Sequence, residues 1–399
     1  MYSDSIKKLS KYVDLDDDKE LSDLTKSISE GMDMTDRIYK NTTKESINCI
    51  FNEFSPKLLE KINASKDDIA LVLSGGGGKG AYQVGAYKAI VEDSRFKISG
   101  ISGTSVGALN AALFCAKDIK DAEAIWQSLT PDDILSPSAD SDFSASDLKL
   151  DNFSLAEKLI LNDIKTENIF TTEFFNDNEF FSRVGLSKII NDTKTPQLLD
   201  MTKPICAISA FNLNDAIPNY FVLNELSDID TEKLLLASSA IPLVFEYVTY
   251  NSKNYYDGGF PLFGNNLPMS PLYSLGYRKF IVIHTDSSKD TYMNINSIKR
   301  NRKLLNEEYF DDGIFLHLFP SKSLGGIREG TLNFDDKYID ETIALGYEDT
   351  KNILQSFNIN EFNIEESEIK NYNSSIEKHI YKNSTFSSYN RLLEGLNSL

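Results

Sequence analysis

The sequence is short of cysteine and of positive charge, and each shortage excludes a class of protein. Its three cysteines, Cys49, Cys115 and Cys206, lie far apart and form no C-x-x-C pair, so we expect neither a disulfide framework nor an oxidising compartment. With 41 Lys and Arg against 60 Asp and Glu, the formal net charge is −19. Such a chain repels phosphate backbones and anionic surfaces, so we expect no nucleic-acid partner, and any membrane contact must come from local apolar surface.

Long apolar runs and clusters of metal ligands are also missing. No window approaches the roughly 18 consecutive apolar residues that a transmembrane helix needs. Residues 1–5 lack the basic and apolar regions of a secretory signal, so we expect a soluble cytoplasmic protein, with export by a signal-less route left open. His, Cys and Asp nowhere show metal-ligand spacing, so we expect no calcium or zinc.

The 399 residues divide by texture into three parts. Residues 1–66 are polar with Leu and Ile at helical spacing, which predicts a helical extension, and residues 358–399 predict a polar helical tail. Residues 67–357 alternate apolar runs with helical patterns, which is typical of a mostly parallel sheet. The expected strands are 69–73, 98–101, 205–210, 220–223, 279–283 and 314–318, with a hairpin at 246–256; the expected helices are 79–92, 106–116, 231–239 and 336–357.

A glycine run, Ser74–Gly80, separates the first expected strand from the first expected helix. Its G-x-G-x-x-G spacing matches a dinucleotide fingerprint, but no acidic residue ends the second strand as that motif requires. A Walker loop fails because Leu73 stands at its first glycine and Gly80 follows Lys79. Two interpretations remain: a tight turn without a ligand, or backbone N–H groups that converge on an anion, of which an oxyanion is one kind.

A second segment, Gly103-Thr104-Ser105-Val106-Gly107, has the G-x-S-x-G pattern of a nucleophile elbow. Gly103 and Gly107 lack Cβ atoms, so a tight turn can form with the Ser105 hydroxyl above the sheet edge. The following helix N-terminus would favour a developing negative charge there. The pattern is common by chance, and it gains specificity here because it follows a glycine-rich strand–helix turn.

A serine nucleophile needs a base, and the histidines are poor candidates. His284 and His317 sit in or beside apolar strand-like runs, where a core role is commoner, and His379 lies in the polar tail. Asp257 ends a tyrosine-rich strand and precedes two glycines, which allow a close backbone approach. A D-G-G sequence alone is usually a turn, so Asp257 gains weight only from the other two segments.

These three segments, in this order, resemble the patatin-like phospholipase family, whose pattern is G-G-G-x-[RK]-G, G-x-S-x-G and D-G-[AG]. The resemblance covers about residues 67–350 and includes Ala237–Phe245, which is similar to the family's A-S-x-A-x-P-x-x-F stretch, and Gly330–Phe334. It implies a three-layer α/β hydrolase-like fold with helices on both faces of the sheet. Asn266-Leu267-Pro268 follows the D-G-G later than the family's Asn-x-Pro does, so we expect a longer loop and a different pocket mouth.

The resemblance also implies a reaction: hydrolysis of a fatty acyl ester of a glycerophospholipid or lysophospholipid by a Ser-Asp dyad, without a cofactor or metal. Ser105 would attack the ester carbonyl and Asp257 would take its proton. Backbone N–H groups of Gly76, Gly77 and Gly78 would hold the oxyanion, while Lys79 would help to fix the loop or face solvent. The remaining motif residues are Gly75, Lys79, Gly80, Gly103, Gly107, Gly258 and Gly259.

The implied substrate is membrane or micellar phospholipid, which would make the protein peripheral to membranes when active. Residues 1–66 could receive a protein activator or an oligomer contact. A regulated binding or sensor protein on a patatin scaffold is the alternative, although three intact catalytic segments disfavour it. A dinucleotide-binding oxidoreductase ranks third.

Residues 130–195 interrupt the alternation of strands and helices and predict an insertion or lid. Their Ser, Asp and Pro content predicts an exposed loop over 131–146. The aromatic side chains that follow either pack a small helical subdomain over the sheet, which is the commoner outcome, or line an acyl-chain channel or a membrane-facing lid. These aromatics are Phe170, Phe174, Phe175, Phe180 and Phe181.

Overall fold

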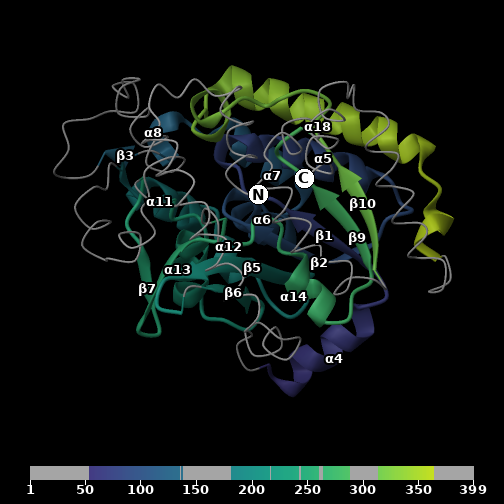
Figure 1. Ribbon diagram of the computed structural model, residues 1–399, viewed down its shortest axis with the longest axis horizontal. Helices are drawn as coiled ribbons and strands as arrows, with labels where there is room; N and C mark the ends of the chain where they lie inside the picture. The colour runs from purple at the N-terminus through teal and green to yellow at the C-terminus, as the bar shows by residue number, and fades with distance from the viewer. Residues whose placement is uncertain are drawn as a thin grey trace, which may run out of the picture.

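The computed structural model describes residues 54–134, 136–137, 181–215, 217–241, 244–259, 264–287 and 313–363, and these residues build one central sheet (Figure 1). The strand order is β10-β9-β1-β2-β5-β8-β7, and β6 pairs with β5 outside this path. The strands are β1 Ile69–Leu73, β2 Ile98–Thr104, β5 Ile205–Asn212, β6 Ile217–Val222, β7 Val248–Tyr250, β8 Lys253–Asp257, β9 Lys279–Ile283 and β10 Ile314–Leu318; β3 Ser136–Pro137 and β4 Phe181–Ser182 pair separately.

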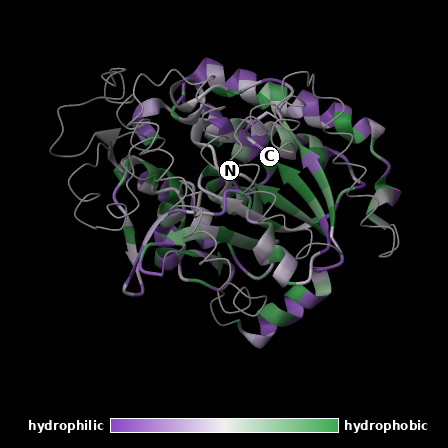
Figure 2. Cartoon of the chain, in the orientation of Figure 1, coloured by the Kyte–Doolittle hydropathy of each residue, from purple (hydrophilic) through white to green (hydrophobic). Residues whose placement is uncertain are grey.

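The sheet is parallel from β10 to β5, and β6, β7 and β8 add antiparallel pairs. Strands such as β1 and β9 are short runs of Val, Ile, Leu and Ala or Phe, and Figure 2 shows the sheet as predominantly hydrophobic. A parallel strand that is covered on both faces of the sheet needs apolar side chains on both faces. This explains why the apolar residues of these strands are consecutive and do not alternate with polar ones. The mostly parallel sheet predicted from the sequence is confirmed.

Helices cover both faces of the sheet, which confirms the three-layer prediction. One core cluster joins Leu71 and Ile281 to the main helical layer, and a second joins Val72 and Phe280 to a smaller layer formed by α4 and α14. The main layer contains α5 Ala81–Glu92, α6 Val106–Ala116, α7 Ile119–Gln127, α11 Val184–Asp192, α13 Asp228–Ser238 and α18 Asp336–Ser356; the smaller layer contains α4 Pro56–Ser65 and α14 Met269–Ser274. The short elements are η1 Gly77–Gly80, α8 Pro131–Ile134, α12 Thr195–Leu198, η3 Ile327–Thr331 and η4 Ile359–Asn363.

Helices α5 and α18 pack backbone against backbone through two glycines. A Cβ atom at Gly85 would lie 1.9 Å from the Ile343 carbonyl oxygen, and one at Gly346 would lie 2.1 Å from the Tyr82 carbonyl oxygen. Any larger residue at these positions would push the helices apart. Figure 2 shows α18 with hydrophilic residues alternating with hydrophobic ones, as expected for a helix on the outside of the layer.

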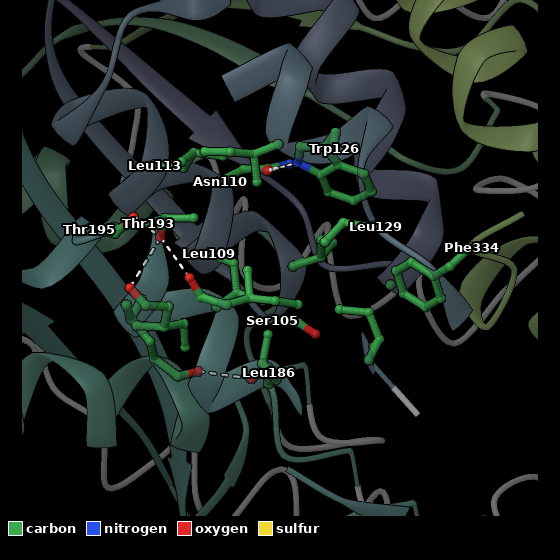
Figure 3. A pocket seen from close by; sticks show the side chains of 18 of the residues that line it. Ser105, Leu109, Asn110, Leu113, Trp126, Leu129, Leu186, Thr193, Thr195 and Phe334 are labelled. Carbon is green, nitrogen blue, oxygen red and sulfur yellow. Dashed lines mark hydrogen bonds between the residues drawn. The ribbon is translucent and has the colours of Figure 1, made fainter. Parts of the chain in front are cut away.

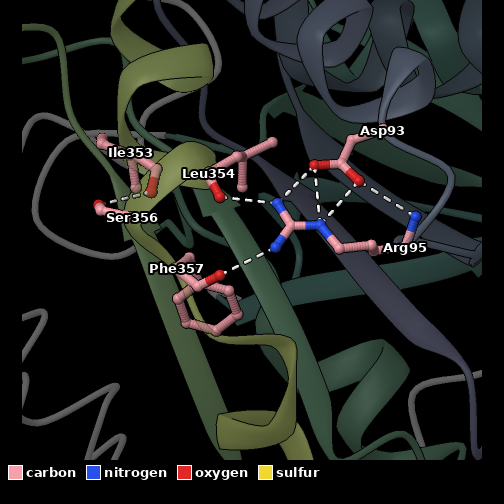
Figure 4. Close-up of polar contacts among 6 residues, drawn as sticks. All are labelled: Asp93, Arg95, Ile353, Leu354, Ser356 and Phe357. Carbon is pink, nitrogen blue, oxygen red and sulfur yellow. Dashed lines mark hydrogen bonds and ion pairs between the residues drawn. The ribbon is translucent and has the colours of Figure 1, made fainter.

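Arg95 closes the C-terminal end of α18 (Figure 4). Its guanidinium donates to the carbonyl oxygens of Leu354, at 2.7 Å, and Phe357, at 3.0 Å, and it is held by an ion pair with Asp93. The last carbonyl groups of a helix have no partner inside the helix, and a cation there also complements the helix dipole. This contact ties the helical layer to the loop before β2.

Two cysteines lie buried on facing elements, Cys115 on α6 and Cys206 on β5, and both are free thiols. Burial raises the pKa of the Cys115 thiol well above its ordinary value, because the thiolate is disfavoured away from water, and the neighbouring Cys206 raises it further. Cys49 lies outside the described residues.

Several predictions differ from the structure in detail. The exposed loop expected from residue 131 begins instead with α8, and the first helix is preceded by the η1 turn from Gly77. Helices α7, α11, α12 and α14 were not predicted. Residues 1–53, Phe170, Phe174, Phe175, Phe180, His379 and most of the tail lie outside the described residues, so the predictions made for them and for the domain boundaries stay predictions.

Candidate active site

Ser105 occupies the sharp turn between β2 and α6 and has φ 57° and ψ −128°, a conformation that non-glycine residues rarely adopt. The flanking glycines make the turn possible. A Cβ at Gly103 would lie 1.9 Å from the Gly107 carbonyl oxygen, and one at Gly107 would lie 2.4 Å from the Leu73 carbonyl oxygen. The two glycines of the G-x-S-x-G segment therefore have the steric role expected of them.

Strand register explains why Asp257 reaches Ser105 from far along the chain. Along one edge of β5, β2 ends with Thr104 opposite Ser209, and β8 ends with Asp257 opposite the next residue, Ala210. Strand β6 occupies the other edge of β5 over the same stretch. The C-terminal ends of β2 and β8 thus meet end to end, and the residues that leave them, Ser105 and Asp257, become neighbours.

The Asp257 carboxyl is buried and only partly hydrogen-bonded. Oδ1 accepts a hydrogen bond from the Gly259 amide at 2.7 Å, whereas Oδ2 has no partner at hydrogen-bonding distance among the described residues. Burial raises the pKa of Asp257 to about 6, and the nearby Ser105 hydroxyl and the Gly259 amide offset part of that rise. The Ser105 hydroxyl is thus near enough to lower the pKa of the Asp257 carboxyl.

A residue that carried no predicted role, Ser238, holds the two chain segments together. The Ser105 amide donates to Ser238 Oγ at 3.0 Å, and the Gly258 amide donates to the Ser238 carbonyl at 3.2 Å. Two residues on, the Ala240 carbonyl accepts from the Asp257 amide at 2.9 Å. Ser238 falls within the stretch that resembled the family pattern, but the sequence carried no signal for this contact. Because its amide is engaged, Ser105 itself cannot supply an oxyanion donor there.

The glycine run is anchored beside Ser105 by the segment that follows β9. Thr285 Oγ1 donates to the Gly75 carbonyl, and Lys79 Nζ pairs with Asp286 Oδ1 at 2.8 Å. A Cβ at Gly75 would lie 3.1 Å from the Ser105 Cβ, so the two backbones are in direct contact. Lys79 fixes the loop, as one of the two sequence interpretations had it, and Thr285 was not predicted.

The amides of Gly76, Gly77 and Gly78 donate no hydrogen bond to any acceptor in the described part of the chain. Gly76 and Gly77 have φ of 153° and 56°, which a side chain would oppose. The loop is also closely packed, since a Cβ at Gly78 would lie 2.0 Å from the Asn333 carbonyl oxygen. These three amides therefore have no acceptor among the described residues, and their turn adjoins the turn that carries Ser105.

Ser105 opens into an apolar cavity of about 100 Å³. Figure 3 shows Ser105 between Thr193 and Thr195 on one side and Trp126 and Phe334 on the other. Helices α6, α7 and α11 each supply several lining residues, so the last part of the predicted 130–195 insertion contributes to the cavity. The lining residues are Gly77, Ser105, Val106, Leu109, Asn110, Leu113, Ile125, Trp126, Leu129, Ile134, Leu186, Ile189, Ile190, Thr193, Thr195, Leu235, Ser239, Ile241, Phe245, Thr331, Leu332 and Phe334.

The two described histidines pair with each other and not with Ser105. His284 Nε2 lies 3.0 Å from His317 Nδ1, and His284 stacks on Phe319 with ring centroids 3.9 Å apart. Burial lowers the pKa of His317 to about 4 and that of His284 well below its ordinary value. Neither ring lines the cavity; His284 is buried and His317 is partly buried between its strand neighbours.

Among the described residues, no group of three or more His, Cys, Asp and Glu side chains is arranged to hold a metal ion. No described helix combines the length and the apolar character that a bilayer span requires.

Comparison with known proteins places the chain in a family. The model of the patatin-like phospholipases matches residues 71–273, which is 203 of 399 residues. The probable lipid hydrolase 463L of Invertebrate iridescent virus 6 is 28% identical over 203 residues, 50% of this chain and 61% of that protein, so the chain spans less than two thirds of this relative. The solved structure of VipD from Legionella pneumophila aligns with 73% of this chain and 67% of its own, at 17% identity and a TM-score of 0.41.

The family match extends over half of the chain and includes all three motif segments, and the chain therefore belongs to the patatin-like phospholipase family.

Proposed function

We propose that this protein is a lipid acyl hydrolase that cleaves a fatty acyl ester of a glycerophospholipid or lysophospholipid. The observation that carries the proposal is the meeting of β2 and β8 on one edge of β5, which puts Ser105 beside the buried Asp257. The apolar cavity in front of Ser105 fits an acyl chain and offers little to a polar substrate. Membership of the family and the name of the viral relative support the same reaction class.

The first half of the reaction forms an acyl-enzyme. Ser105 Oγ attacks the ester carbonyl while Asp257 accepts the hydroxyl proton, and the proton then passes to the departing alcohol. A pKa of about 6 suits this base better than the ordinary value of 3.8, because the carboxylate is ionised at neutral pH yet binds a proton more readily. In the second half, water attacks the acyl-enzyme with Asp257 again as base, which releases the fatty acid and restores Ser105.

The tetrahedral intermediate in each half carries a negative oxygen. The free amides of Gly76, Gly77 and Gly78 are the donors that we assign to it, assisted by the N-terminus of α6. Loss of a single oxyanion donor commonly costs about 2.7–4 kcal/mol of transition-state stabilisation. Among the substitutions only proline removes a backbone N–H, and its fixed φ is incompatible with the φ of 153° and 56° at Gly76 and Gly77, so the donors are tested best through the residues that hold the run in position.

The nucleophile is tested with a fluorophosphonate probe and with a short soluble ester. Wild-type protein should be labelled at Ser105, as peptide mass spectrometry would show, and Ser105→Ala should lose both labelling and hydrolysis. Its free energy of unfolding should stay within about 1 kcal/mol, since one small side chain is removed. Ser128→Ala, an exposed serine at the end of α7, is the matched control and should behave as wild type.

The base is tested by comparing Asp257→Asn with alanine variants of the histidines. We expect Asp257→Asn to lose hydrolysis, and His284→Ala, His317→Ala and His379→Ala to keep substantial activity per folded molecule. A well-folded histidine variant as inactive as Ser105→Ala would instead indicate a triad. Wild-type protein that neither labels nor hydrolyses a panel of lipids, yet binds them, would favour the sensor protein on the same scaffold.

A further inference from the structure

Asn110 is a buried polar side chain in the cavity wall with no part in the reaction as described above. It lies on α6, the helix that begins at the nucleophile, and it is 1% exposed. Its Nδ2 donates to the Gly80 carbonyl at 3.0 Å and to Gln83 Oε1 at 2.9 Å. Its Oδ1 accepts from the Trp126 indole at 2.8 Å, a contact visible in Figure 3.

Gln83 continues this network to the other end of the glycine run. Its Nε2 donates to the Ser74 carbonyl at 2.7 Å, and the side chain is fully buried. Ser74 and Gly80 are the first and last residues of the run that contains the free amides. Asn110 and Gln83 therefore fix both ends of the run to the helix that carries Ser105, across one chain of hydrogen bonds.

Trp126 joins this network to the cavity. Its indole carbons lie 3.0 and 3.1 Å from where a Cβ at Gly80 would stand, so the ring packs directly on the glycine run. The same ring and Asn110 itself line the cavity. An acyl chain in the cavity would thus touch the network that sets the position of the run.

We infer that Asn110 is a positioning residue that, with Gln83 and Trp126, sets the oxyanion donors of the glycine run against Ser105. The inference rests on the proposed hydrolase function. The run has few side chains of its own to fix its position, and on its other side it is held by hydrogen bonds with Thr285, Asn266 and Ile283 and by the Lys79–Asp286 pair. Small displacements of catalytic groups can reduce rates about a hundredfold, so the network should act on turnover more than on substrate binding.

The test measures kcat and KM for a short soluble ester with Asn110→Ala and Trp126→Phe. Trp126→Phe removes the indole hydrogen bond to Asn110 together with the outer ring atoms that contact Gly80, so it tests the same network from the cavity side. We expect kcat to fall about 10- to 100-fold in Asn110→Ala and about 5-fold or more in Trp126→Phe, with KM within about 3-fold of wild type. Asn191→Ala, an exposed asparagine of α11 whose side chain bonds only to the Ser187 carbonyl, is the matched control.

A pH profile separates positioning from chemistry. The hydrogen bonds of the Asn110 side chain go to Gly80, Gln83 and Trp126 and not to Ser105 or Asp257, so the midpoint of kcat against pH should remain at the wild-type value while its height falls. Far-UV circular dichroism and a cooperative unfolding transition establish that each variant is folded, and if Asn110→Ala does not fold, Trp126→Phe alone decides.

Unchanged kcat in a folded variant, or a rise in KM that accounts for the whole loss, overturns the inference while the wild type remains an active hydrolase. A wild type that neither hydrolyses esters nor reacts with the probe overturns the proposed function and the inference together.

Discussion

Among the individual residues, Asp257 has a protonation state that the site itself determines. Burial holds its pKa at about 6, and only the ionised carboxylate can accept the proton of Ser105. We therefore expect kcat/KM for a neutral short ester to fall as the pH drops through about 6 and to level off above it. Rates measured from pH 4.5 to 8.5 check this, with the fold monitored by circular dichroism. A profile that is flat across pH 6 would contradict the role of Asp257 as base.

The same pKa shift predicts that Asp257 lowers stability at neutral pH. Its folded pKa, about 6, lies above the unfolded value of 3.8, so folding favours the protonated form. The protonated carboxyl contributes fully to the free energy of unfolding below about pH 4, and this contribution is lost as the pH rises through 6. Each unit of difference between the folded and unfolded pKa corresponds to about 1.4 kcal/mol. We expect Asp257→Asn to exceed wild type in free energy of unfolding by about 3 kcal/mol at pH 8, and by only about 1 kcal/mol at pH 4.5. Urea titrations at the two pH values measure it, and equal stabilities at pH 8 would refute it.

At the residue scale, the sequence predicted those site residues that belong to local patterns. Ser105 and the glycine run stand in short motifs whose geometry depends on a few neighbouring residues. The contacts that hold these motifs in place join distant segments: Ser238 lies 133 residues from Ser105, and Thr285 lies 210 from Gly75. No single segment contains such a pair, so reasoning from one sequence had no signal for it.

Among the elements, the contact of α5 with α18 depends on the absence of a side chain at Gly346. Gly346→Ala would place a methyl group 2.1 Å from the Tyr82 carbonyl oxygen, and the helices would have to separate. Overpacking of this kind typically costs about 1–3 kcal/mol. Urea unfolding should show that loss. Gly326→Ala is the matched control, because its Cβ would meet only a side-chain oxygen at 3.4 Å. Equal stability of the two variants would show that the helices adjust freely.

Helix α6 also predicts how the cavity selects acyl chains. It begins at Ser105, and Leu109 and Leu113 follow along the cavity wall. At 1.5 Å per residue, Leu113 lies about 12 Å along the helix from the nucleophile. We expect Leu113→Trp to reduce kcat/KM for a twelve-carbon ester more than 10-fold and to spare a four-carbon ester.

A series of nitrophenyl esters measures this preference. Val91→Trp, at an exposed position of α5, controls for the added indole and should leave the preference unchanged. If Leu113→Trp reduced the rates for all chain lengths equally, the acyl chain would have to run elsewhere.

At the element scale, the sequence predicted β1, α6, β9 and β10 with the bounds that the structure shows. These are apolar runs with clear breaks on either side. The position of β8 could not be predicted, because nothing in the residues of a short antiparallel strand says which edge of β5 it will join. The edge that β8 joins determines whether Asp257 lies beside Ser105. The pairing of these two residues could therefore be predicted only from the three sequence motifs and not from the expected strands.

For the molecule as a whole, the net charge of −19 bears on how it reaches lipid. Anionic vesicles should repel it, and salt should weaken the repulsion as the Debye length shortens from about 30 Å at 0.01 M to about 8 Å at 0.15 M. We expect phospholipid hydrolysis on anionic vesicles to rise across this range and hydrolysis on zwitterionic vesicles to change little. A fluorogenic phospholipid in both vesicle types measures the rates. Faster hydrolysis of anionic vesicles at low salt would indicate a basic docking surface instead.

The three-layer arrangement of the whole molecule was predictable because alternating buried strands and helices have few other stable solutions. The sequence did not predict which helices cover which face of the sheet. Helix α4, from the predicted N-terminal extension, packs Leu58 and Ile62 into the smaller layer and so belongs to the folded core. The helical spacing of Leu and Ile in residues 1–66 predicted apolar helix faces, but it did not predict the part of the sheet against which such a face would pack.

The buried thiols of Cys115 and Cys206 have a practical consequence. They lie on α6 and β5, the elements that carry the nucleophile and that align it with its base. Thiol reagents attack exposed thiolates, so neither cysteine can react until these two elements come apart. In a Cys49→Ser variant, the rate of alkylation of Cys115 and Cys206 would therefore measure how often α6 and β5 separate. A lipid bound in the cavity should slow this alkylation, so the rate would also report lipid binding without an added label.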